Sequence, residues 1–475
     1  MWIPMILAIP LLFIALLWIT PIRVQPWLAV AATFINIAVV IIQAVSGGLR
    51  VTYFGWILPP DTLSLVVLGV TLFVGFTAAL YSVGYIRREH AGDEAPAGKP
   101  RTYFSLLLAF YWALLAVPLM NNVIITWAFI EATALASVFL VDYHRTKKTA
   151  EASWKYIILM EVGGISALLG TIALLVSEPG TVHVATWTGL AALANSLPSK
   201  WLAIAFVLVL AGYGTKAGLV PFNAWLPDAH SQAPSPVSAM LSAIKLNAAM
   251  YGVIRFQSIL RADHEGPFAS HTLLLIGVLT VLVSTLMTIK QHDVKRLFAY
   301  SSSENLGLIA IGFALGPIGT LGAYLQMINH SVIKSMLFYE SGELLLATGT
   351  TEMNRYRGMA TQRPGVGSNL LLGMLAIAGA PPFGLFISEL VIIFALVHES
   401  SLWLAALVTL LLAILFANFL FYAMRIGLGK SVSGGTSHAS AQSGWTTFVP
   451  TWGHTAASLA LGIFLPYLLL LGHTL

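Results

Sequence analysis

Long apolar runs follow one another along almost the whole chain, and they constrain the fold more than any other feature of the sequence. The chain has 475 residues, of which 58% are hydrophobic and 9% are charged. A soluble domain carries about a quarter of its residues as charges. Runs of about 20 apolar residues are long enough to cross the hydrocarbon core of a bilayer as helices. The sequence therefore predicts an all-α integral membrane protein.

Counting these runs predicts about 14 transmembrane helices. The first run has no basic residue before it, so we interpret it as a first span and not as a cleavable signal peptide. The predicted spans lie near residues 2–20, 27–46, 62–86, 102–120, 121–142, 152–176, 201–222, 236–260, 271–289, 297–315, 320–346, 368–397, 401–424 and 454–472.

Basic residues are distributed unevenly between alternate connections of these spans. With the N-terminus outside, 16 of the 24 Lys and Arg residues fall in cytoplasmic connections, 5 fall within spans, and only Arg50, Lys200 and Arg261 fall in external connections. Cytoplasmic loops of membrane proteins carry such an excess. We therefore expect a cell inner (cytoplasmic) membrane protein with both termini outside. The net charge of +5 is then a result of orientation and does not indicate a nucleic-acid partner.

The chain contains no cysteine, which excludes thiolate-ligated iron–sulfur clusters, disulfides and thiol catalysis. It also lacks the glycine-rich phosphate-binding motifs of nucleotide enzymes. Asp228 and His230 lie two residues apart in a short connection, which is too few ligands for a metal site. We therefore expect no cofactor, metal or catalytic centre on this chain, and any redox chemistry would lie on another subunit.

Ionisable residues nevertheless occur within or beside the predicted spans. A charge at mid-bilayer is costly, so such residues usually mark an ion path or a buried ion pair. A passive scaffold would not need them. The residues are Glu131, Lys155, Glu161, Lys216, Lys245, Glu304, His330, Lys334, Glu340, Glu343 and Glu389.

Two spans contain prolines that predict interruptions of the helix. Pro221 has no N–H to bond the carbonyl four residues back, so we expect the helix that carries Lys216 to break about one turn past the lysine. Pro381 and Pro382 predict a second break, with Glu389 about two turns beyond it.

The two predicted breaks share the pattern Gly-x-x-Pro-Phe-x-x-aromatic, at residues 218–225 and 379–386. Paired proline-interrupted segments are typical of transporters built from two repeats. We predict two five-helix repeats, which are inverted because the number of spans in each is odd. The predicted regions are three N-terminal spans in 1–101, the first repeat in 102–260, the second repeat in 261–425, and a loop with the last span in 426–475.

His330 and Lys334 are four residues apart and share a helical face, so the pair can relay protons. In the alternative interpretation, the histidine bonds to backbone and the lysine pairs with Glu340 or Glu343.

Three other charged groups also leave alternatives open. Lys155 follows Glu151 by four residues near a membrane surface, and the pair may be no more than a helix-stabilising bridge in the second interpretation. Glu161 and Glu304 are either members of a relay or carboxyls neutralised by protonation.

The segments 216–230, 233–239, 293–302 and 381–389 resemble the antiporter-like subunits of respiratory complex I and of Mrp-type cation/proton antiporters. The resemblance covers nearly the whole chain. Ile-Asn-His-Ser at 328–331 and Pro-Pro-Phe-Gly-Leu-Phe-Ile-Ser-Glu at 381–389 look most like the F-type membrane subunit of hydrogenase-4 and related group 4 nickel–iron hydrogenases. The resemblance implies fourteen helices in two inverted five-helix repeats, with helices 7 and 12 broken.

The resemblance also implies roles for individual residues. Glu131 corresponds to the family's fifth-helix glutamate, Lys216 to the lysine of the broken seventh helix, and Glu389 to the acid of the broken twelfth helix. Lys155 and His330 match further positions on the family's polar axis.

One position departs from the family pattern. Many relatives have a central lysine four residues before Tyr-Gly, where this chain has Asn247, and Lys245 lies two residues earlier. Two residues turn an α-helix by about 200°. We therefore expect Lys245 to face another way.

The leading hypothesis is a proton-translocating subunit of a hydrogenase-type or complex I-like assembly, with nickel–iron and iron–sulfur partner subunits. The alternative is a cation/proton antiporter subunit, with Na⁺ as the counter-ion, or the ion-coupling subunit of another uptake system. A structural module that conducts nothing is a third hypothesis, which the buried charges oppose.

Overall fold

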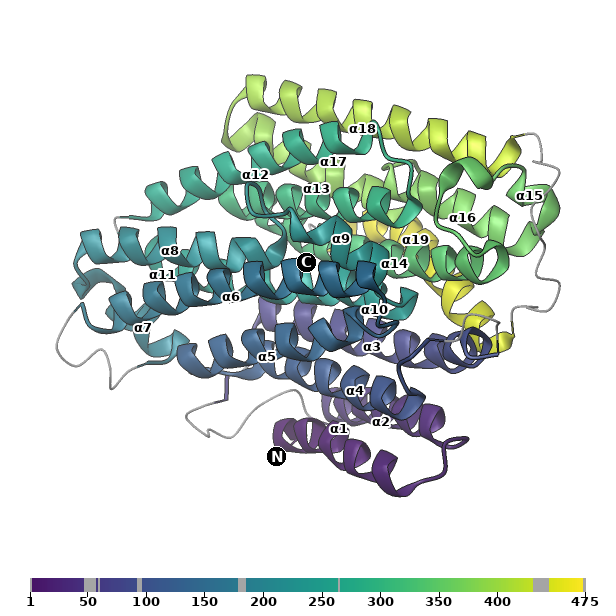
Figure 1. Ribbon diagram of the computed structural model, residues 1–475. Helices are drawn as coiled ribbons and strands as arrows, with labels where there is room; N and C mark the ends of the chain where they lie inside the picture. The colour runs from purple at the N-terminus through teal and green to yellow at the C-terminus, as the bar shows by residue number, and fades with distance from the viewer. Residues whose placement is uncertain are drawn as a thin grey trace.

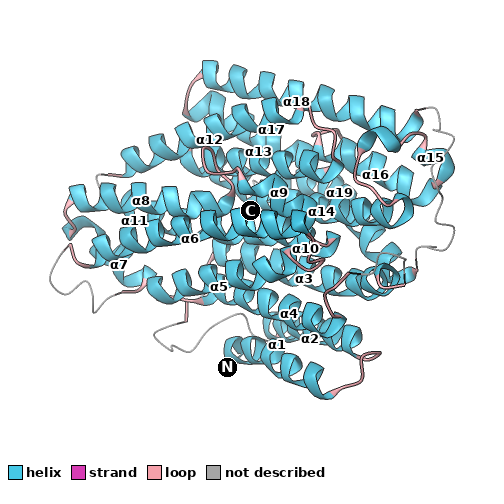
Figure 2. Cartoon of the chain, viewed as in Figure 1, coloured by secondary structure: helices cyan, strands magenta, loops and turns pink. Residues whose placement is uncertain are grey.

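The structure is a computed structural model that describes residues 2–46, 57–58, 60–91, 96–177, 185–263, 265–429 and 444–472. Within these ranges every extended regular element is a helix, and β pairing is limited to isolated bridges. Figure 2 shows helices joined by short loops. The helices are α1 (Trp2–Ile19), α2 (Gln25–Val45), α3 (Thr62–Glu89), α4 (Pro100–Ala116), α5 (Val123–Val141), α6 (Lys147–Leu175), α7 (Trp187–Leu193), α8 (Ser199–Ala217), α9 (Trp225–Gln232), α10 (Ser235–Met240), a π-helical segment (Leu241–Lys245), α11 (Leu246–Arg261), α12 (Gly266–Thr288), α13 (Val294–Ala314), α14 (Pro317–Thr348), α15 (Met359–Gln362), α16 (Pro364–Ile377), α17 (Gly384–Glu399), α18 (Leu402–Leu428) and α19 (Trp445–Gly472).

The long helices lie side by side, with most connections at the two ends of the bundle (Figure 1). The N-terminal helices α1 and α2 form one edge of this view and α18 forms the opposite edge. Helix α14 lies inside the bundle, where it contacts α3, α13, α16, α17 and α19. Side chains on α14 are therefore held away from the surface.

Eleven helices in the described part of the chain are long and apolar enough to cross a membrane. Helices α13 and α14 and the pair α16–α17 coincide with three further predicted spans, and they carry buried ionisable groups. The all-helical membrane fold is confirmed. The count of fourteen spans and the inverted repeat stay predictions.

The distribution of side chains is inverted relative to a soluble protein. Large apolar side chains are more than half exposed on the outer helices, for example Ile42 on α2, Val162 on α6 and Phe421 on α18. Charged and polar side chains are buried at the centre. A bilayer solvates the first group and cannot solvate the second, so this arrangement is that of a membrane-spanning bundle.

Both predicted helix breaks occur where the prolines place them. Helix α8 ends at Ala217, and Gly218 follows with a φ of 73°, a left-handed conformation that favours glycine. Helix α16 ends at Ile377, Gly379 has a φ of 77°, and α17 begins at Gly384. The Val220–Pro221 and Pro381–Pro382 peptide bonds are cis.

Side chains from neighbouring helices bond the backbone groups that the breaks leave free. At the first break, Ser303 Oγ donates to the Gly218 carbonyl at 2.6 Å, and the Val220 N–H donates to Thr280 Oγ1 at 3.0 Å. At the second break, Asn329 Nδ2 donates to the Gly384 carbonyl at 2.9 Å. Irregular backbone is tolerated inside a membrane protein when it is satisfied in this way.

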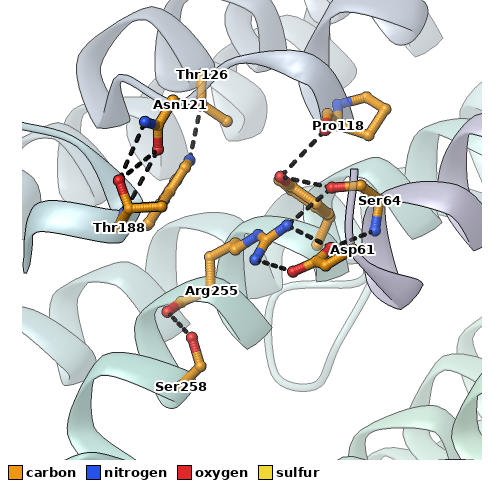
Figure 3. Close-up of polar contacts among 10 residues, drawn as sticks. Asp61, Ser64, Pro118, Asn121, Thr126, Thr188, Arg255 and Ser258 are labelled. Carbon is orange, nitrogen blue, oxygen red and sulfur yellow. Dashed lines mark hydrogen bonds and ion pairs between the residues drawn. The ribbon is translucent and has the colours of Figure 1, made fainter. Parts of the chain in front are cut away.

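A polar cluster at one end of the bundle ties α3 to α11 (Figure 3). Asp61 caps α3 by accepting a hydrogen bond from the Ser64 N–H. The Arg255 guanidinium donates to both Asp61 carboxylate oxygens, at 2.6 and 2.8 Å, and to Ser64 Oγ at 2.8 Å. Burial raises the pKa of Asp61, but the hydrogen bond and charge of Arg255 lower it further, so the pKa lies below its ordinary value.

We expect Asp61→Asn to lower the thermal unfolding midpoint at neutral pH, because it removes a paired carboxylate. A group with a lowered folded-state pKa stabilises the fold above its unfolded pKa of about 4 and stops doing so as the pH falls through its folded pKa. The difference between the wild type and the variant should therefore shrink when the pH is lowered from about 5 to about 3. Melting of the detergent-purified protein measures this. Glu151→Gln, in an exposed pair, is the control, and a difference that grows on acidification would contradict the assignment.

Candidate functional site

A buried ion pair joins α5 to the end of α8. Lys216 Nζ lies 2.8 Å from Glu131 Oε2, and the side chain of Lys216 is 0% exposed. The ammonium also donates to the Met160 carbonyl of α6 at 2.8 Å. Lys216 lies in the last turn before the break at Gly218, so its position follows from the proline that ends the helix. The predicted partnership of Lys216 with an acid is thus present in the structure.

Glycines on α6 and α8 make this pair sterically accessible. A Cβ on Gly164 would collide with the Glu131 carboxylate. Gly163 and Gly212 place the backbones of α6 and α8 against each other, since a Cβ on either would overlap the other's carbonyl oxygen. Small residues at helix crossings allow such close approach in membrane proteins.

Lys245 extends the cluster toward the middle of the bundle. Its ammonium donates to Tyr156 Oη at 2.6 Å and approaches Met160 Sδ at 3.2 Å. It also lies 4.7 Å from the centre of the Trp225 ring, a cation–π contact. Met160 therefore contacts both Lys216 and Lys245.

The expectation that Lys245 faces away from the other lysine is wrong. It assumed the rotation of a regular α-helix, whereas Leu241–Lys245 is a π-helical segment that shifts the register of the residues around it. Asn247 takes the other direction: its Nδ2 donates to Ser331 Oγ on α14 at 2.9 Å. The lysine thus keeps a place beside α6, and the asparagine fills the contact with α14.

His230 on α9 continues the series, although sequence reasoning weighed it only as a metal ligand. Its ring stacks on Phe338 of α14 with centroids 5.0 Å apart, and both ring nitrogens are buried without a hydrogen-bond partner in the described residues. Lys245, Lys295 and Lys334 all act on it electrostatically. Lys295, from the start of α13, is itself buried and donates to the Ala233 carbonyl at 2.9 Å. Its position near a span end hid it from a search for charges inside spans.

His330 and Lys334 on α14 are both fully buried. Lys334 Nζ donates to the Phe298 carbonyl of α13 at 2.7 Å. Neither ring nitrogen of His330 has a hydrogen-bond partner in the part of the chain that the structure describes. The histidine is therefore not bonded to backbone, as the alternative interpretation required. Buried polar atoms of this kind normally bind protein or ordered water.

Amide and hydroxyl groups connect Glu304 to the second break. Asn305 Nδ2 donates to Glu304 Oε2 at 2.8 Å, and Gln326 Nε2 donates to Asn305 Oδ1 at 2.8 Å. Ser388 Oγ on α17 donates to Gln326 Oε1 at 2.5 Å. The next residue, Glu389, is buried, and its carboxylate lies against Gly379 at the break.

Two predicted members lie outside this buried series. Lys155 is half exposed and pairs with Glu151 at 2.7 Å, as the bridge interpretation proposed, and also with Asp228 at 3.3 Å. Glu161 is exposed at the middle of α6. An isolated sequence does not show which face of α6 is turned outward, because apolar residues line both faces.

Glu340 and Glu343, the alternative partners of Lys334, have partners of their own. Glu340 Oε1 accepts a hydrogen bond from Asn369 Nδ2 at 2.6 Å. Glu343 forms an ion pair with Arg88 and accepts a hydrogen bond from Tyr81 at 3.2 Å. These contacts join α14 to α16 and α3.

Electrostatic interactions link the buried groups in an unbroken order across the bundle. Neighbours in this order act on each other, although hydrogen bonds do not join every step. The order is Glu131, Lys216, Lys245, His230, His330 with Lys334, Glu304 and Glu389. We call these eight residues the central axis. Within the described residues, no group of three His, Asp or Glu side chains is placed to hold a metal ion.

A family model described as NADH:quinone oxidoreductase/Mrp antiporter, TM, matches residues 120–415. The chain belongs to this family of membrane proteins. The match covers Glu131, Lys216 and Glu389 and both helix breaks. The predicted family, stated from sequence motifs alone, is confirmed.

Three relatives place the chain within the antiporter family. It is 35% identical to the hydrogenase-4 component F homolog of Methylacidiphilum infernorum over 411 residues, which cover 86% of this chain and 85% of the relative. A chain of an archaeal membrane-bound sulfane sulfur reductase superposes with a TM-score of 0.86 at 26% identity, covering 98% of this chain and 95% of the other. A chain of the Mrp complex from Dietzia sp. DQ12-45-1b shares the fold, with a TM-score of 0.80 at 20% identity and coverages of 98% and 95%.

We expect Glu131→Ala to destabilise the protein by about 3 kcal/mol, because it leaves the fully buried Lys216 without its counter-charge. Replacing both partners, Glu131→Gln with Lys216→Met, should restore much of the loss. Thermal denaturation in detergent, followed by size-exclusion chromatography, measures both. Glu161→Gln, at an exposed carboxylate of α6, is the matched control. A Glu131→Ala protein as stable as the wild type would show that the pair is not formed.

Proposed function

We propose that this chain is the proton-translocating, antiporter-like membrane subunit of a hydrogenase-type or complex I-like energy-converting complex. The observation that supports this most strongly is the central axis, because a structural subunit gains nothing from eight ionisable groups that are buried in succession. The carbonyls and hydroxyls beside these groups give protons and water places to bind.

The Glu131–Lys216 pair is the element that responds to a partner. An intact pair stabilises the ammonium of Lys216, and opening the pair leaves a buried charge that is costly unless the proton departs. Lys245 is the next proton acceptor along the axis. Its contacts with Tyr156 and Trp225 hold it where it can receive this proton.

The second half of the axis carries the proton onward. A neutral histidine has one nitrogen that accepts and one that donates, so His230 and His330 are suited to pass a proton between the lysines around them. Glu304 and Glu389 are suited to bind and release it beside the broken α17. Lys334, between the histidines and Glu304, sets the charge at this crossing.

Partner subunits are part of the proposal. Glu161 is exposed at the centre of α6, between exposed Ile158 and Ile165. In an isolated chain this carboxyl would meet hydrocarbon, which is costly, whereas a neighbouring subunit can cover or neutralise it. Redox centres, including nickel–iron and iron–sulfur groups, would lie on other subunits. The charge bias between loops places the chain in the cell inner membrane with both termini outside.

We expect Lys216→Met and Glu131→Gln each to abolish most proton movement by the reconstituted complex, while the complex stays assembled. Each change removes a group that must hold a charge or exchange a proton. Quenching of a pH-sensitive dye in proteoliposomes measures transport while the partner reaction runs. Lys155→Gln, off the axis, should transport normally.

Normal pumping by both axis variants would leave a structural role ahead. Transport that requires Na⁺, and that persists without a redox partner, would instead support the alternative of a cation/proton antiporter subunit.

For Glu389 we expect Gln to block transport and Asp to retain part of it, because an amide cannot bind and release a proton whereas the shorter carboxyl can. The charged group that acts on Glu389 is another carboxyl, Glu304, and not a lysine. A role limited to neutralising a lysine therefore has little support. Vesicle acidification by the Gln and Asp variants measures this, and equal transport by both would exclude proton exchange at Glu389.

A further inference from the structure

Away from the central axis, a pocket of about 660 Å³ opens where four segments meet at one end of the bundle. It lies between the α1–α2 connection, the last turns of α3, the first turn of α4 and the first turn of α19. In Figure 1 the start of α19 lies beside the end of α3, and the two helices are in contact. Its volume is that of a typical small-molecule site, about 300–1,000 Å³.

The rim of this pocket is basic. Arg23 and Arg87 line it and are both exposed, and no ion pair among the described residues involves either of them. The described lining includes no acidic side chain. His90 also lines it but is already held, with Nδ1 at 2.9 Å from the Ile86 carbonyl and Nε2 at 3.1 Å from the Gly98 carbonyl. Two free guanidinium groups are therefore available to an anion.

The floor and wall of the pocket are apolar and aromatic. Ile86 and Phe104 form buried parts of the lining. Trp27 and Trp445 stack on each other, with centroids 5.7 Å apart and ring planes at 25°. Tryptophans gather where a membrane protein meets the headgroup layer, because the ring is apolar and its N–H is polar. The pocket thus combines a charged rim with an apolar interior at a membrane boundary.

We propose that this pocket binds the phosphate headgroup of an anionic phospholipid, with Arg23 and Arg87 on the phosphate and the glycerol and upper acyl chain against the apolar floor. Arginine binds phosphate through two parallel hydrogen bonds, and basic pockets between transmembrane helices are sites for anionic lipids. A bound lipid would connect α1 and α2, which form one edge of the bundle, to α3, α4 and α19. This site is separate from the axis, so its failure would leave the transport proposal untouched.

Native mass spectrometry of the delipidated, detergent-purified full chain tests the proposal, with phosphatidylglycerol, phosphatidylethanolamine and glycerol 3-phosphate as probes. We expect one phosphatidylglycerol to bind, and Arg23→Gln with Arg87→Gln to weaken its binding about tenfold or more. The double variant Lys147→Gln with Lys148→Gln removes the same charge from exposed positions on α6 and should bind like the wild type. Phosphatidylethanolamine should bind weakly to every variant.

Each other outcome overturns a stated part of the proposal. Undiminished phosphatidylglycerol binding by the arginine variant would remove the site. Glycerol 3-phosphate binding as tightly as the lipid would make it a site for soluble phosphates. Loss of a copurifying subunit in the arginine variant of the whole complex, with lipid binding unchanged, would make the pocket a protein interface. Quenching of Trp27 and Trp445 by brominated phosphatidylglycerol, compared with Trp27→Phe and Trp445→Phe, locates the lipid independently.

Discussion

The ion pair between Glu131 and Lys216 is the interaction on which the rest of the structure depends. Its burial is costly unless both charges keep their hydrogen-bond partners, so α5, α6 and α8 must remain close together. Gly163, Gly164 and Gly212 permit that approach. The break at Gly218 then ends α8 one turn later, and α9 turns back with Trp225 and His230 toward the centre. One buried pair thus fixes the geometry of the first half of the axis.

The second half is organised by hydrogen bonds more than by ion pairs. Around Glu304 the partners are amides and hydroxyls, and the Asn329 and Ser303 side chains bond carbonyls released at the two breaks. Such groups stabilise a carboxyl in either protonation state, because they can donate or accept. The two halves therefore hold charge differently: the first by opposite charges, the second by neutral partners that tolerate a change of protonation.

The sequence predicted the spans, both helix breaks, and the burial of Lys216, His330, Lys334 and Glu389, because long apolar runs and prolines act locally. It could not predict the direction of Lys245, since a π-helical segment is not visible in residue spacing. It also passed over His230 as an axis member, which becomes central only when α9 folds back beneath α14. Lys155 was placed on the axis by family resemblance, and its pairing with Asp228 depends on a contact 73 residues away.

Met160 decides what the present arrangement of the axis can do. Its carbonyl accepts a hydrogen bond from Lys216, and its thioether contacts Lys245. A carbonyl and a thioether accept hydrogen bonds but have no proton to pass on. The two lysines therefore share a neighbour that holds both and relays nothing between them. Transfer from Lys216 to Lys245 requires that an ammonium leave Met160 or that water insert beside it. The opening of the Glu131–Lys216 pair frees the first of these ammonium groups to move, so the same ion pair that positions the axis also controls conduction along it.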